Sequence, residues 1–405
     1  MRTRVDEMTL RIGRQHVGSG EPLFVIAEIG LNHGGSVDRA IAMVDAAAAA
    51  GASAVKLQTI VAAELVTSAC PAPAHVQAAS LREFLAVFEL DEAAHHAIAA
   101  RARARGLALI ATPLSEGAVD LLERVGVDAY KIASGDLTWT RLIGRCAHTG
   151  KPLILSTGMA TIAEVAHGLA HAKLAGASSL ALLHCVSAYP VPHGSENLGA
   201  IATLREAFSI PVGLSDHGAD TSAVPIAVVL GASLYERHLV LTAEDDSVDA
   251  AVSSTPAGLA DLIRTAAWVT VALGSGRKEC LPAEAVNIRA SRRGLYAARA
   301  MAAGHLITGS DVQALRPASA LSPDLQDALV GSLLARDIDA GMPFLECDLD
   351  GPDSVPAAQG FSHAQGATTV AQPPTQGFGE PRRSSPDQQA SGGGGFSPAL
   401  VERPS

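Results

Sequence analysis

Two of the five lysines in this 405-residue chain lie inside short apolar runs, Lys56 in Ala-Val-Lys-Leu-Gln-Thr and Lys131 in Ala-Tyr-Lys-Ile-Ala-Ser. Almost every other basic residue is arginine. Lysine is a compact point charge suited to a phosphate, a carbonyl group or an imine, whereas arginine is a wide planar fork. A single lysine in a strand can simply extend its ammonium group to water. Two lysines in equivalent positions predict a functional site. In that site both lysines could bind an anion, or one of them could act as a nucleophile.

Small hydroxyl side chains and one carboxylate stand at the ends of other apolar runs. The hydroxyls are Thr112, Ser134, Ser156 and Ser215. With two ammonium groups they suit a compact dianion or trianion such as a phosphorylated carboxylate, because charge-assisted hydrogen bonds are about twice as strong as neutral ones. Glu28, at the end of the first run, is the candidate general acid or base, or else a salt-bridge partner of one lysine.

Two histidines follow consecutive apolar runs, His217 in Leu-Ser-Asp-His-Gly and His238 in Tyr-Glu-Arg-His-Leu. Neighbouring strands would bring both imidazoles to one metal ion. Two protein ligands leave positions open for water and substrate, as a catalytic metal requires. Other histidines, such as His95 and His96 or the pair His167 and His171, fall on predicted helices and are expected at the surface.

The elements that must position these residues are eight short apolar runs, which alternate with helical stretches between residues 22 and 276. The runs are Leu23–Ile29, Ala54–Gln58, Ala108–Thr112, Ala129–Ala133, Pro152–Ser156, Leu180–Cys185, Pro211–Ser215 and Leu234–Leu239. Ser36–Ala50 and Thr161–Ala175 are typical of the intervening helices, each with a capping residue first and a glycine after it. Eight strand-then-helix units predict a (β/α)8 TIM barrel, with chemistry at the carboxyl ends of the strands. An open doubly wound sheet is the alternative.

Polar residues stand at the carboxyl end of all eight predicted strands. In chain order they are Glu28 with Asn32 and His33; Lys56 and Gln58; Thr112; Lys131, Ser134 and Asp136; Ser156 and Thr157; His184, Ser187 and Tyr189; Ser215, Asp216 and His217; and Glu236 with His238. One or two polar ends would mean little. A polar residue at every strand end predicts a functional site at the mouth of the barrel.

The rest of the chain divides by composition. We expect an N-terminal segment over 1–21, a barrel over 22–276 and a linker over 277–290. Turn-spaced glycines and prolines predict a small β-rich domain over 291–350. From 351 to 405 the chain is rich in Gly, Pro, Gln and Ser, with too little apolar material to form a core, so this tail is predicted to be disordered.

Composition also excludes some classes of protein. The formal net charge is −11, which argues against non-specific binding to nucleic acid or anionic membranes. No apolar run approaches the ~20 residues that span a bilayer. The five cysteines form no disulfide or zinc pattern. A soluble cytoplasmic protein is expected.

Taken in order, the strand-end motifs resemble those of the N-acetylneuraminate (sialic acid) synthase family. The motifs are Ala-Glu-Ile-Gly-Leu-Asn-His-Gly-Gly from 27, Val-Lys-Leu-Gln-Thr from 55, Tyr-Lys-Ile-Ala-Ser-Gly-Asp from 130, Leu-Ser-Thr-Gly-Met from 155, Leu-Leu-His-Cys-Val-Ser-Ala-Tyr-Pro from 182, Gly-Leu-Ser-Asp-His from 213 and Glu-Arg-His from 236. The resemblance covers about residues 22–350. The stretch from Arg292 to Pro317 resembles the family's C-terminal antifreeze-like, or SAF, domain.

The resemblance implies a metal-dependent condensation of phosphoenolpyruvate with N-acetylmannosamine or a related 2-acetamido sugar. Phosphoenolpyruvate would be held by Lys56, Thr112, Lys131, Ser134, Ser156 and Ser215, and the catalytic set would be Glu28, Lys56, Lys131 and Asp136. His217 and His238 would bind Mn²⁺ or Mg²⁺. Gln58, Tyr189 and Asp249 would contact the sugar. Arg316 would reach the partner's site in a domain-swapped homodimer.

Four positions depart from the family pattern. Asp136 stands where the family has Glu, which shortens a carboxylate near the substrate by one methylene. Residues 247–250 keep only Asp249 of a Gly-Pro-Asp-His stretch. Arg237 replaces Lys, and Ala318 replaces Gly after Arg316 and Pro317. Residues assigned to chemistry are kept while sugar-facing ones differ, so phosphoenolpyruvate and the metal are better defined than the sugar.

Three alternatives remain open. A synthase of the same type could make legionaminic acid, pseudaminic acid or another 3-deoxy-ulosonate. A pyruvate aldolase could use Lys131 as a Schiff-base nucleophile. A sugar-binding protein that has lost catalysis would need none of the paired lysines and histidines.

Overall fold

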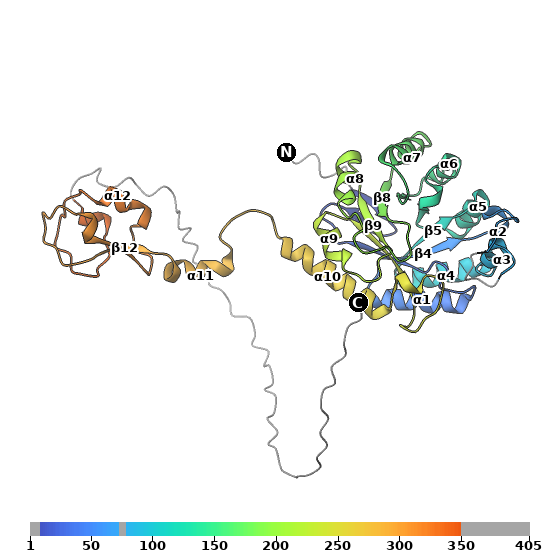
Figure 1. Cartoon of the computed structure of the whole chain (residues 1–405), viewed down its shortest axis with the longest axis horizontal. Coiled ribbons are helices and arrows are strands. Elements are labelled where there is room, and N and C mark those ends of the chain that lie inside the picture. Colours follow the sequence, from blue (N-terminus) through green and yellow to red (C-terminus); the bar gives the residue numbers. More distant parts are fainter. Residues whose placement is uncertain (1–8, 73–77, 350–405) are drawn as a thin grey trace, which may run out of the picture. The chain divides into compact units, whose positions relative to one another are not determined.

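The computed structural model describes residues 9–72 and 78–349. The chain divides into two compact units, with the boundary in the sequence between Lys278 and Glu279 (Figure 1). The first unit contains a closed barrel. Its eight strands are β3 (Phe24–Glu28), β4 (Ala54–Thr59), β5 (Ala108–Pro113), β6 (Ala129–Ile132), β7 (Leu153–Ser156), β8 (Leu180–Cys185), β9 (Val212–Asp216) and β10 (Leu234–Leu239). They lie close to the ranges expected from the sequence.

Strand pairing closes the sheet and excludes the open doubly wound alternative. Each strand is parallel to the next, and β10 pairs with both β9 and β3. The last of these pairings sets His238 beside Glu28. The short strand β11 (Ser253–Ser254) pairs with the end of β10. Because the strands are parallel, all their carboxyl ends meet at one end of the barrel.

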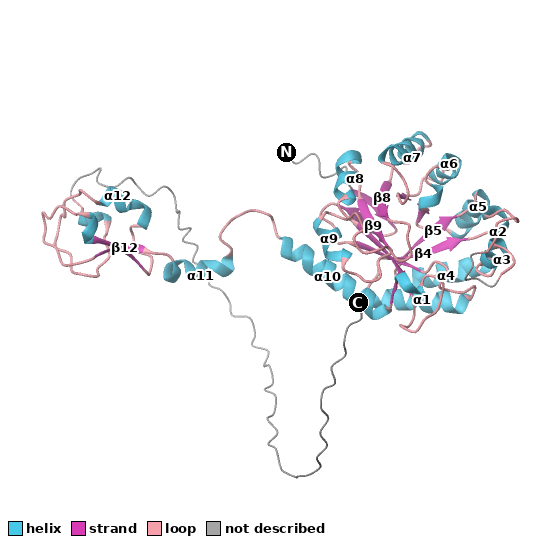
Figure 2. Ribbon diagram, viewed as in Figure 1, coloured by secondary structure: helices cyan, strands magenta, loops and turns pink. Residues whose placement is uncertain are grey.

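Helices connect the strands and surround them (Figure 2). They are α1 (Val37–Ala50), α2 (Ala62–Leu65), α3 (Leu81–Ala86), α4 (Glu92–Ala104), α5 (Glu116–Val125), α6 (Thr140–Ala147), α7 (Ile162–Leu174), α8 (Ala200–Phe208), α9 (Ala223–Val229) and α10 (Pro256–Leu273). Local chemistry sets their ends. Ser36 caps α1 by accepting from the backbone N–H of Arg39, and Gly51 ends it in the left-handed conformation. Thr161 and Glu164 form a capping box on α7.

The amino end of the barrel is closed by a hairpin that was not predicted within residues 1–21. Its strands are β1 (Thr9–Ile12) and β2 (Gln15–Gly18). Leu10, Ile12 and Val17 pack with inward-facing residues of the strands to form the lower core of the barrel. A larger core fills the layer between strands and helices.

The second unit has its own hydrophobic core, which includes Leu295, Phe344 and Leu349. Its elements are α11 (Pro282–Ser291), β12 (Gly294–Ala297), β13 (Val312–Leu315), α12 (Gln326–Leu329) and the 3-10 turns η4 (Gly309–Asp311), η5 (Pro323–Leu325) and η6 (Glu346–Asp348). β12 and β13 pair antiparallel, with four further isolated bridges. Helix α11 occupies most of the expected linker. The predicted disordered tail, 351–405, lies outside the described residues.

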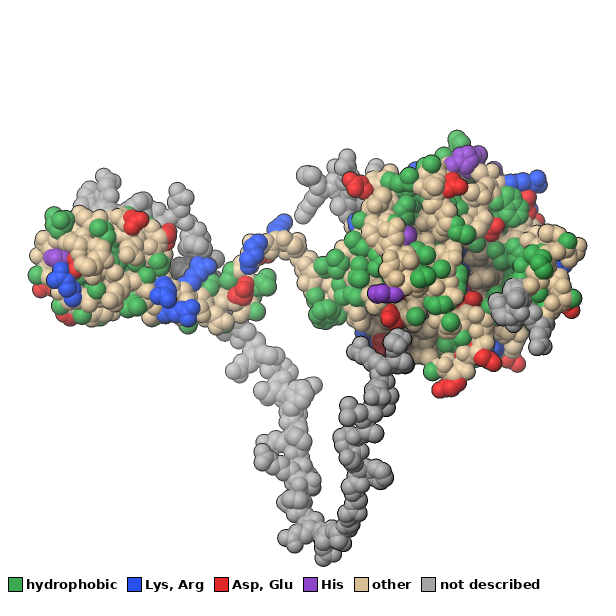
Figure 3. Space-filling model, viewed as in Figure 1, with side chains coloured by type: hydrophobic (Ala, Val, Ile, Leu, Met, Phe, Trp, Pro, Cys, Tyr) green, Lys and Arg blue, Asp and Glu red, His purple; other side chains and the backbone are tan. Residues whose placement is uncertain are grey.

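The structure also bears on the charge, the apolar helices and the cysteines of the chain. Acidic side chains are scattered over the visible face of the barrel unit (Figure 3), in keeping with the net charge of −11. In the described part of the chain no helix is long and apolar enough to cross a membrane. All five cysteines are free.

Candidate active site

The site lies where the inward-facing side chains of the strands change from apolar to charged. Inward-facing positions at the amino end of the barrel are apolar, for example Ile26, Ala54 and Ala129. Two residues further along the same strands, the inward positions are Glu28, Lys56 and Lys131, because side chains alternate between the two faces of a strand. The polar residues therefore rest on an apolar layer, inside the carboxyl end of the barrel.

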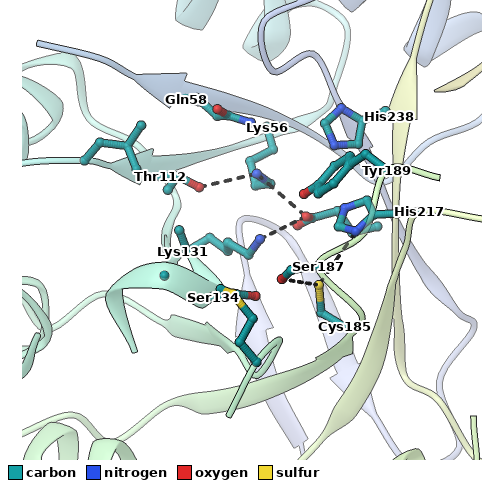
Figure 4. Close-up of a pocket in the computed structure, with 15 residues that line it drawn as sticks. Lys56, Gln58, Thr112, Lys131, Ser134, Cys185, Ser187, Tyr189, His217 and His238 are labelled. Atoms are coloured by element: carbon teal, nitrogen blue, oxygen red, sulfur yellow. Dashed lines mark hydrogen bonds and ion pairs between the residues drawn. The ribbon is translucent and has the colours of Figure 1, made fainter. Parts of the chain in front are cut away.

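Lys56 and Lys131, with residues of other strands, line a cavity of about 280 Å³. Its walls are Lys56, Gln58, Thr112, Leu114, Lys131, Ala133, Ser134, Gly135, Met159, Cys185, Ser187, Tyr189, His217, Glu236 and His238. Figure 4 shows the two lysines and the two histidines facing the same space from different strands. Most predicted site residues are thus brought together by the fold.

Glu236 lies at the centre of the charged cluster. Its Oε1 accepts hydrogen bonds from Lys131 Nζ at 3.1 Å and from Ser215 Oγ at 3.0 Å. Lys56 Nζ is 3.8 Å from the same oxygen, and dashed lines from both lysines meet there in Figure 4. Burial acts to raise the pKa of Glu236, but Lys131 and Lys56 outweigh it and bring the pKa to about 2. Glu236 therefore stays ionised between the two ammonium groups.

Glu28 is the second carboxylate of the cluster and behaves differently. It forms a buried ion pair with Lys56, whose Nζ also donates to Thr112 Oγ1 at 3.3 Å. Burial, and the nearby charge of Glu236, raise the pKa of Glu28, although Lys56 acts against the shift. For Lys56, burial is opposed by Glu236 and Glu28, which raise its pKa overall. Two neighbouring carboxyl groups with pKa values moved apart are an arrangement suited to acid–base chemistry.

Some buried polar atoms of the cluster have no hydrogen-bond partner among the described residues. They include Ser156 Oγ and Glu236 Oε2. Such atoms are costly unless a ligand or water satisfies them. Ser134 Oγ, which lines the cavity, accepts from the backbone N–H of Gly158 at 3.1 Å.

The two histidines come from neighbouring strands, with ring centroids 5.5 Å apart. His217 Nδ1 lies 3.2 Å from the carbonyl oxygen of Val186, which favours a proton on Nδ1 and leaves the Nε2 lone pair free. Burial lowers the pKa of His238 well below its usual value, so this imidazole is neutral. Its Nδ1 has no hydrogen-bond partner among the described residues and lies 3.4 Å from Asp249 Oδ2.

Neutral imidazoles with available nitrogens are the form that binds metals. Within residues 9–72 and 78–349, no group of three His, Cys, Asp or Glu side chains could hold an ion by itself. A divalent ion would thus have two protein ligands here, with further positions left for water and substrate. The residues fit such an ion.

The predicted sugar contacts are placed as follows. Gln58 and Tyr189 line the cavity, and the Tyr189 ring stacks on His217 with centroids 4.1 Å apart. Asp249 lies beside His238, outside the cavity lining, where its backbone N–H donates to Asn32 Oδ1. Arg316 is exposed on the second unit.

Asp136 is a departure from the expected arrangement. It ends the 3-10 turn η2 (Ser134–Asp136), and its side chain does not line the cavity although Ser134 and Gly135 do. Burial raises the pKa of Asp136. Besides Glu28, the carboxylate that faces the lysines is Glu236, to which sequence reasoning gave no role. The signal was available, because Glu236 and His238 are two residues apart on one strand and must face the same way.

One expectation about the histidines is wrong. His95 was expected at the surface but is buried, with Nε2 at 3.1 Å from Thr59 Oγ1 and Nδ1 at 2.9 Å from the carbonyl oxygen of Asp91. A helix in a barrel has one face against the strands, and His95 lies on that face. His96 and His167 are exposed, as expected.

Fold and site together define a (β/α)8-barrel protein with a buried cluster of paired charges at the carboxyl ends of its strands. The NeuB family profile matches residues 43–278, and the SAF domain profile matches 292–350. This chain belongs to the NeuB family and carries a C-terminal SAF domain, as the strand-end motifs predicted.

Three similar proteins illustrate the family. An uncharacterized protein, MJ1065, from Methanocaldococcus jannaschii is 36% identical over 76% of this chain and 89% of its own length. N,N'-diacetyllegionaminic acid synthase from Legionella pneumophila is 33% identical over 81% of this chain and 95% of its own. The crystal structure of an N-acetylneuraminic acid synthetase from Leptospira borgpetersenii has a TM-score of 0.64 and 30% identity, covering 69% of this chain and 95% of that one.

Proposed function

We propose that this protein condenses phosphoenolpyruvate with a 2-acetamido sugar to give a nonulosonic acid and phosphate. The observation that carries the proposal is the cluster of Lys56, Lys131 and Glu236 inside the barrel mouth. Relatives that match most of the chain are named as synthases of legionaminic and N-acetylneuraminic acids. These products differ in the acceptor sugar, so the proposal specifies a class of acceptor.

Charge balance in the cluster favours an anionic substrate. Two ammonium groups face one firmly ionised carboxylate, Glu236, and a second carboxyl group, Glu28, whose pKa is raised. When Glu28 is protonated the cluster carries a net positive charge. Phosphoenolpyruvate would bring its phosphate and carboxylate to Lys56 and Lys131.

Hydroxyl groups would complete the binding of this anion. Thr112 Oγ1 already contacts Lys56, and Ser215 Oγ contacts Glu236. Ser156 Oγ is buried and has no partner among the described residues, which leaves its proton for a substrate oxygen. Hydrogen bonds from these groups and from Ser134 would orient the phosphate so that carbon 3 points towards the mouth.

In the reaction, carbon 3 of phosphoenolpyruvate bonds to the aldehyde carbon of the open-chain sugar, and the aldehyde oxygen takes up a proton. Water adds at carbon 2 and loses a proton, and the carbon–oxygen bond to phosphate then breaks to leave a ketone. Glu28, with its raised pKa, is the group we assign to this proton transfer. A Mn²⁺ or Mg²⁺ ion held by His217 and His238 would supply Lewis-acid polarisation of the aldehyde oxygen.

We propose that the second unit completes the sugar end of the site in a homodimer. Tyr189, at the rim of the cavity, is 55% exposed. Arg316 is exposed on a separate compact unit. Placed over a partner's cavity, Arg316 would cover the sugar and exclude water.

The proposal is tested by measuring phosphate release from phosphoenolpyruvate with a panel of acetamido sugars, with and without EDTA, and by mass spectrometry of the products. We expect EDTA-sensitive release and a mass equal to the sugar plus pyruvate. If no acetamido sugar in the panel gave phosphate release, the result would contradict the synthase and favour a non-catalytic sugar-binding protein. The panel also separates N-acetylmannosamine from acceptor sugars that would give legionaminic or pseudaminic acid.

A Schiff-base aldolase is the competing use of Lys131. An imine needs a lysine nitrogen that is free to attack a carbonyl group, whereas Lys131 Nζ is engaged in a hydrogen bond to Glu236 Oε1. Borohydride would trap pyruvate on Lys131 in an aldolase, with turnover insensitive to EDTA. We expect no trapping.

A further inference from the structure

Arg237 is a buried arginine with no assigned role. It lies on β10 between Glu236 and His238, and only 1% of its surface is exposed. Because strand side chains alternate, Glu236 and His238 face the cavity while Tyr235 and Arg237 face the surrounding helices. Arg237 therefore acts from behind the cavity wall, without contact with the cavity itself.

The guanidinium group contacts the backbone on both sides of His217. Arg237 Nη1 donates to the carbonyl oxygen of Gly218 at 2.8 Å and is 3.4 Å from that of Asp216. The same nitrogen is 3.2 Å from Asp216 Oδ2, and Nε donates to Ser254 Oγ at 3.2 Å. One side chain thus joins β10 to the end of β9 and to β11.

The other backbone and carboxylate groups of residues 216–218 are also hydrogen-bonded. The carbonyl oxygen of His217 accepts from the backbone N–H of Val191 at 2.9 Å. Asp216 Oδ1 accepts from the Gly218 N–H at 2.8 Å, and Asp216 Oδ2 accepts from the Tyr235 hydroxyl. Three consecutive carbonyl groups, 216 to 218, therefore have donors. The backbone that carries His217 has little freedom to shift or rotate.

We propose that Arg237 is a positioning residue that fixes the backbone of His217 so that its imidazole faces His238 across the cavity. The inference rests on the proposed function, in which both histidines bind a divalent ion. A metal site with only two protein ligands depends strongly on their relative placement. Groups that orient metal ligands typically change metal affinity or activity by about 10–100-fold when they are altered.

The positioning contacts need a long side chain with several donors. Nη1 of Arg237 reaches the two carbonyl groups while Nε reaches Ser254. The lysine of the family pattern would keep the positive charge beside Asp216 and could still donate to a carbonyl oxygen. Arg237→Gln, which removes the charge and most of these donors, is therefore the variant that tests the positioning role.

The test measures Mn²⁺ binding by electron paramagnetic resonance, without turnover. Relative to the wild type, we expect Arg237→Gln to raise the Mn²⁺ Kd by about tenfold and to alter the spectrum of the bound ion. Tyr235→Phe, which keeps the volume and removes one donor to Asp216, should produce a smaller change in the same direction. Phosphoenolpyruvate binding, followed by calorimetry in EDTA, should stay within twofold of the wild type, because Lys56 and Lys131 are not touched.

Arg103→Gln is the matched control. Arg103 Nη2 also donates to two backbone carbonyl groups, those of Val125 and Gly126, but away from the histidines. It should leave Mn²⁺ binding unchanged. An unchanged Mn²⁺ Kd and spectrum in Arg237→Gln, with a wild type that binds Mn²⁺, would overturn the positioning role alone. A wild type that binds no Mn²⁺ would overturn the proposed metal site together with this inference.

Discussion

Lys131 on β6 and Glu236 on β10 are 105 residues apart in the sequence, yet Lys131 Nζ donates to Glu236 Oε1 at 3.1 Å inside the barrel. Ser215 donates to the same oxygen, and Lys56 lies near it. One carboxylate oxygen therefore connects the side chains of three other strands. The lysines are held in place before any substrate arrives, which reduces the cost of ordering them on binding.

Glu236→Gln should destabilise the protein. The change removes the charge that compensates two buried ammonium groups, and breaking a buried ion pair costs about 3–5 kcal/mol. The pKa of Glu236 is lowered to about 2, so its contribution is present above pH 4.5 and is lost as the pH falls towards 2. Urea unfolding at pH 7 measures the effect, with the exposed Glu21→Gln as control. Equal unfolding free energies for Glu236→Gln and the wild type would contradict a compensating role.

Glu28→Gln should separate binding from chemistry. Glutamine keeps the size of the side chain and a polar contact to Lys56 but cannot accept the proton. We expect kcat to fall by about 10²–10⁴-fold. The Kd for phosphoenolpyruvate, measured by calorimetry, should change no more than severalfold. A large loss of binding with normal kcat would show that Glu28 is structural.

His217→Ala should abolish metal-dependent phosphate release while leaving the thermal unfolding midpoint close to that of the wild type, because the residue lies at the cavity wall. The exposed His167→Ala is the control for an accidental metal site on α7. Full activity of His217→Ala at micromolar metal would show that the ligand assignment is wrong.

Arg316→Ala should raise KM for the sugar more than the Kd for phosphoenolpyruvate. If Arg316 acts on the partner's cavity, mixed dimers of Arg316→Ala and His217→Ala subunits contain one site with both wild-type residues. Mixing the two inactive or weakened variants under conditions of subunit exchange should then restore activity. A mixture no more active than its components would contradict a shared site.

Stability should fall between pH 6.5 and pH 4 because of His33. Burial, with smaller effects of His95 and Arg39, lowers the pKa of His33 to about 4. The folded state therefore resists protonation that the unfolded state accepts near pH 6.5. Stability is complete above that pH and decreases by about 3 kcal/mol as the pH approaches 4, at 1.36 kcal/mol per unit.

His33→Asn tests this prediction. Asparagine can still accept from the Gly35 N–H, which His33 Nδ1 does at 2.9 Å, but it does not titrate. In EDTA, the variant should lose part of the slope of unfolding free energy against pH, and the remainder includes His95, whose pKa burial also lowers. An unchanged slope would exclude His33 as its source.

Strand positions were predictable from the sequence because each barrel strand is a short apolar run with a polar end. Closure of the barrel followed from the number of units, and the order of the motifs predicted the family. Lys56, Thr112, Lys131 and Ser134 reached the cavity as expected because a parallel barrel brings every strand end to one place.

The rest of the site could not be predicted because it depends on which way each side chain points, and a list of strand-end residues does not give that direction. Glu236 and Asp136 are both carboxylates after apolar residues, but one faces the lysines and the other lies in a 3-10 turn outside the cavity lining. His95 was misplaced because adjacent residues on a helix point about 100° apart, and here His96 faces solvent while His95 lies on the face that packs against the strands. The hairpin β1–β2 was missed because its eight paired residues are half polar and give little apolar signal.

The hairpin β1–β2 makes the two ends of the barrel different. Leu10, Ile12 and Val17 fill the amino end of the barrel, so we expect substrates to reach the cavity from the carboxyl end. Of the residues that line the cavity, the two lysines are buried, whereas Tyr189 is exposed. A sugar bound first would obstruct the passage of phosphoenolpyruvate. We therefore expect ordered addition, with phosphoenolpyruvate first, and a sugar that protects it from dissociating until the chemistry is complete.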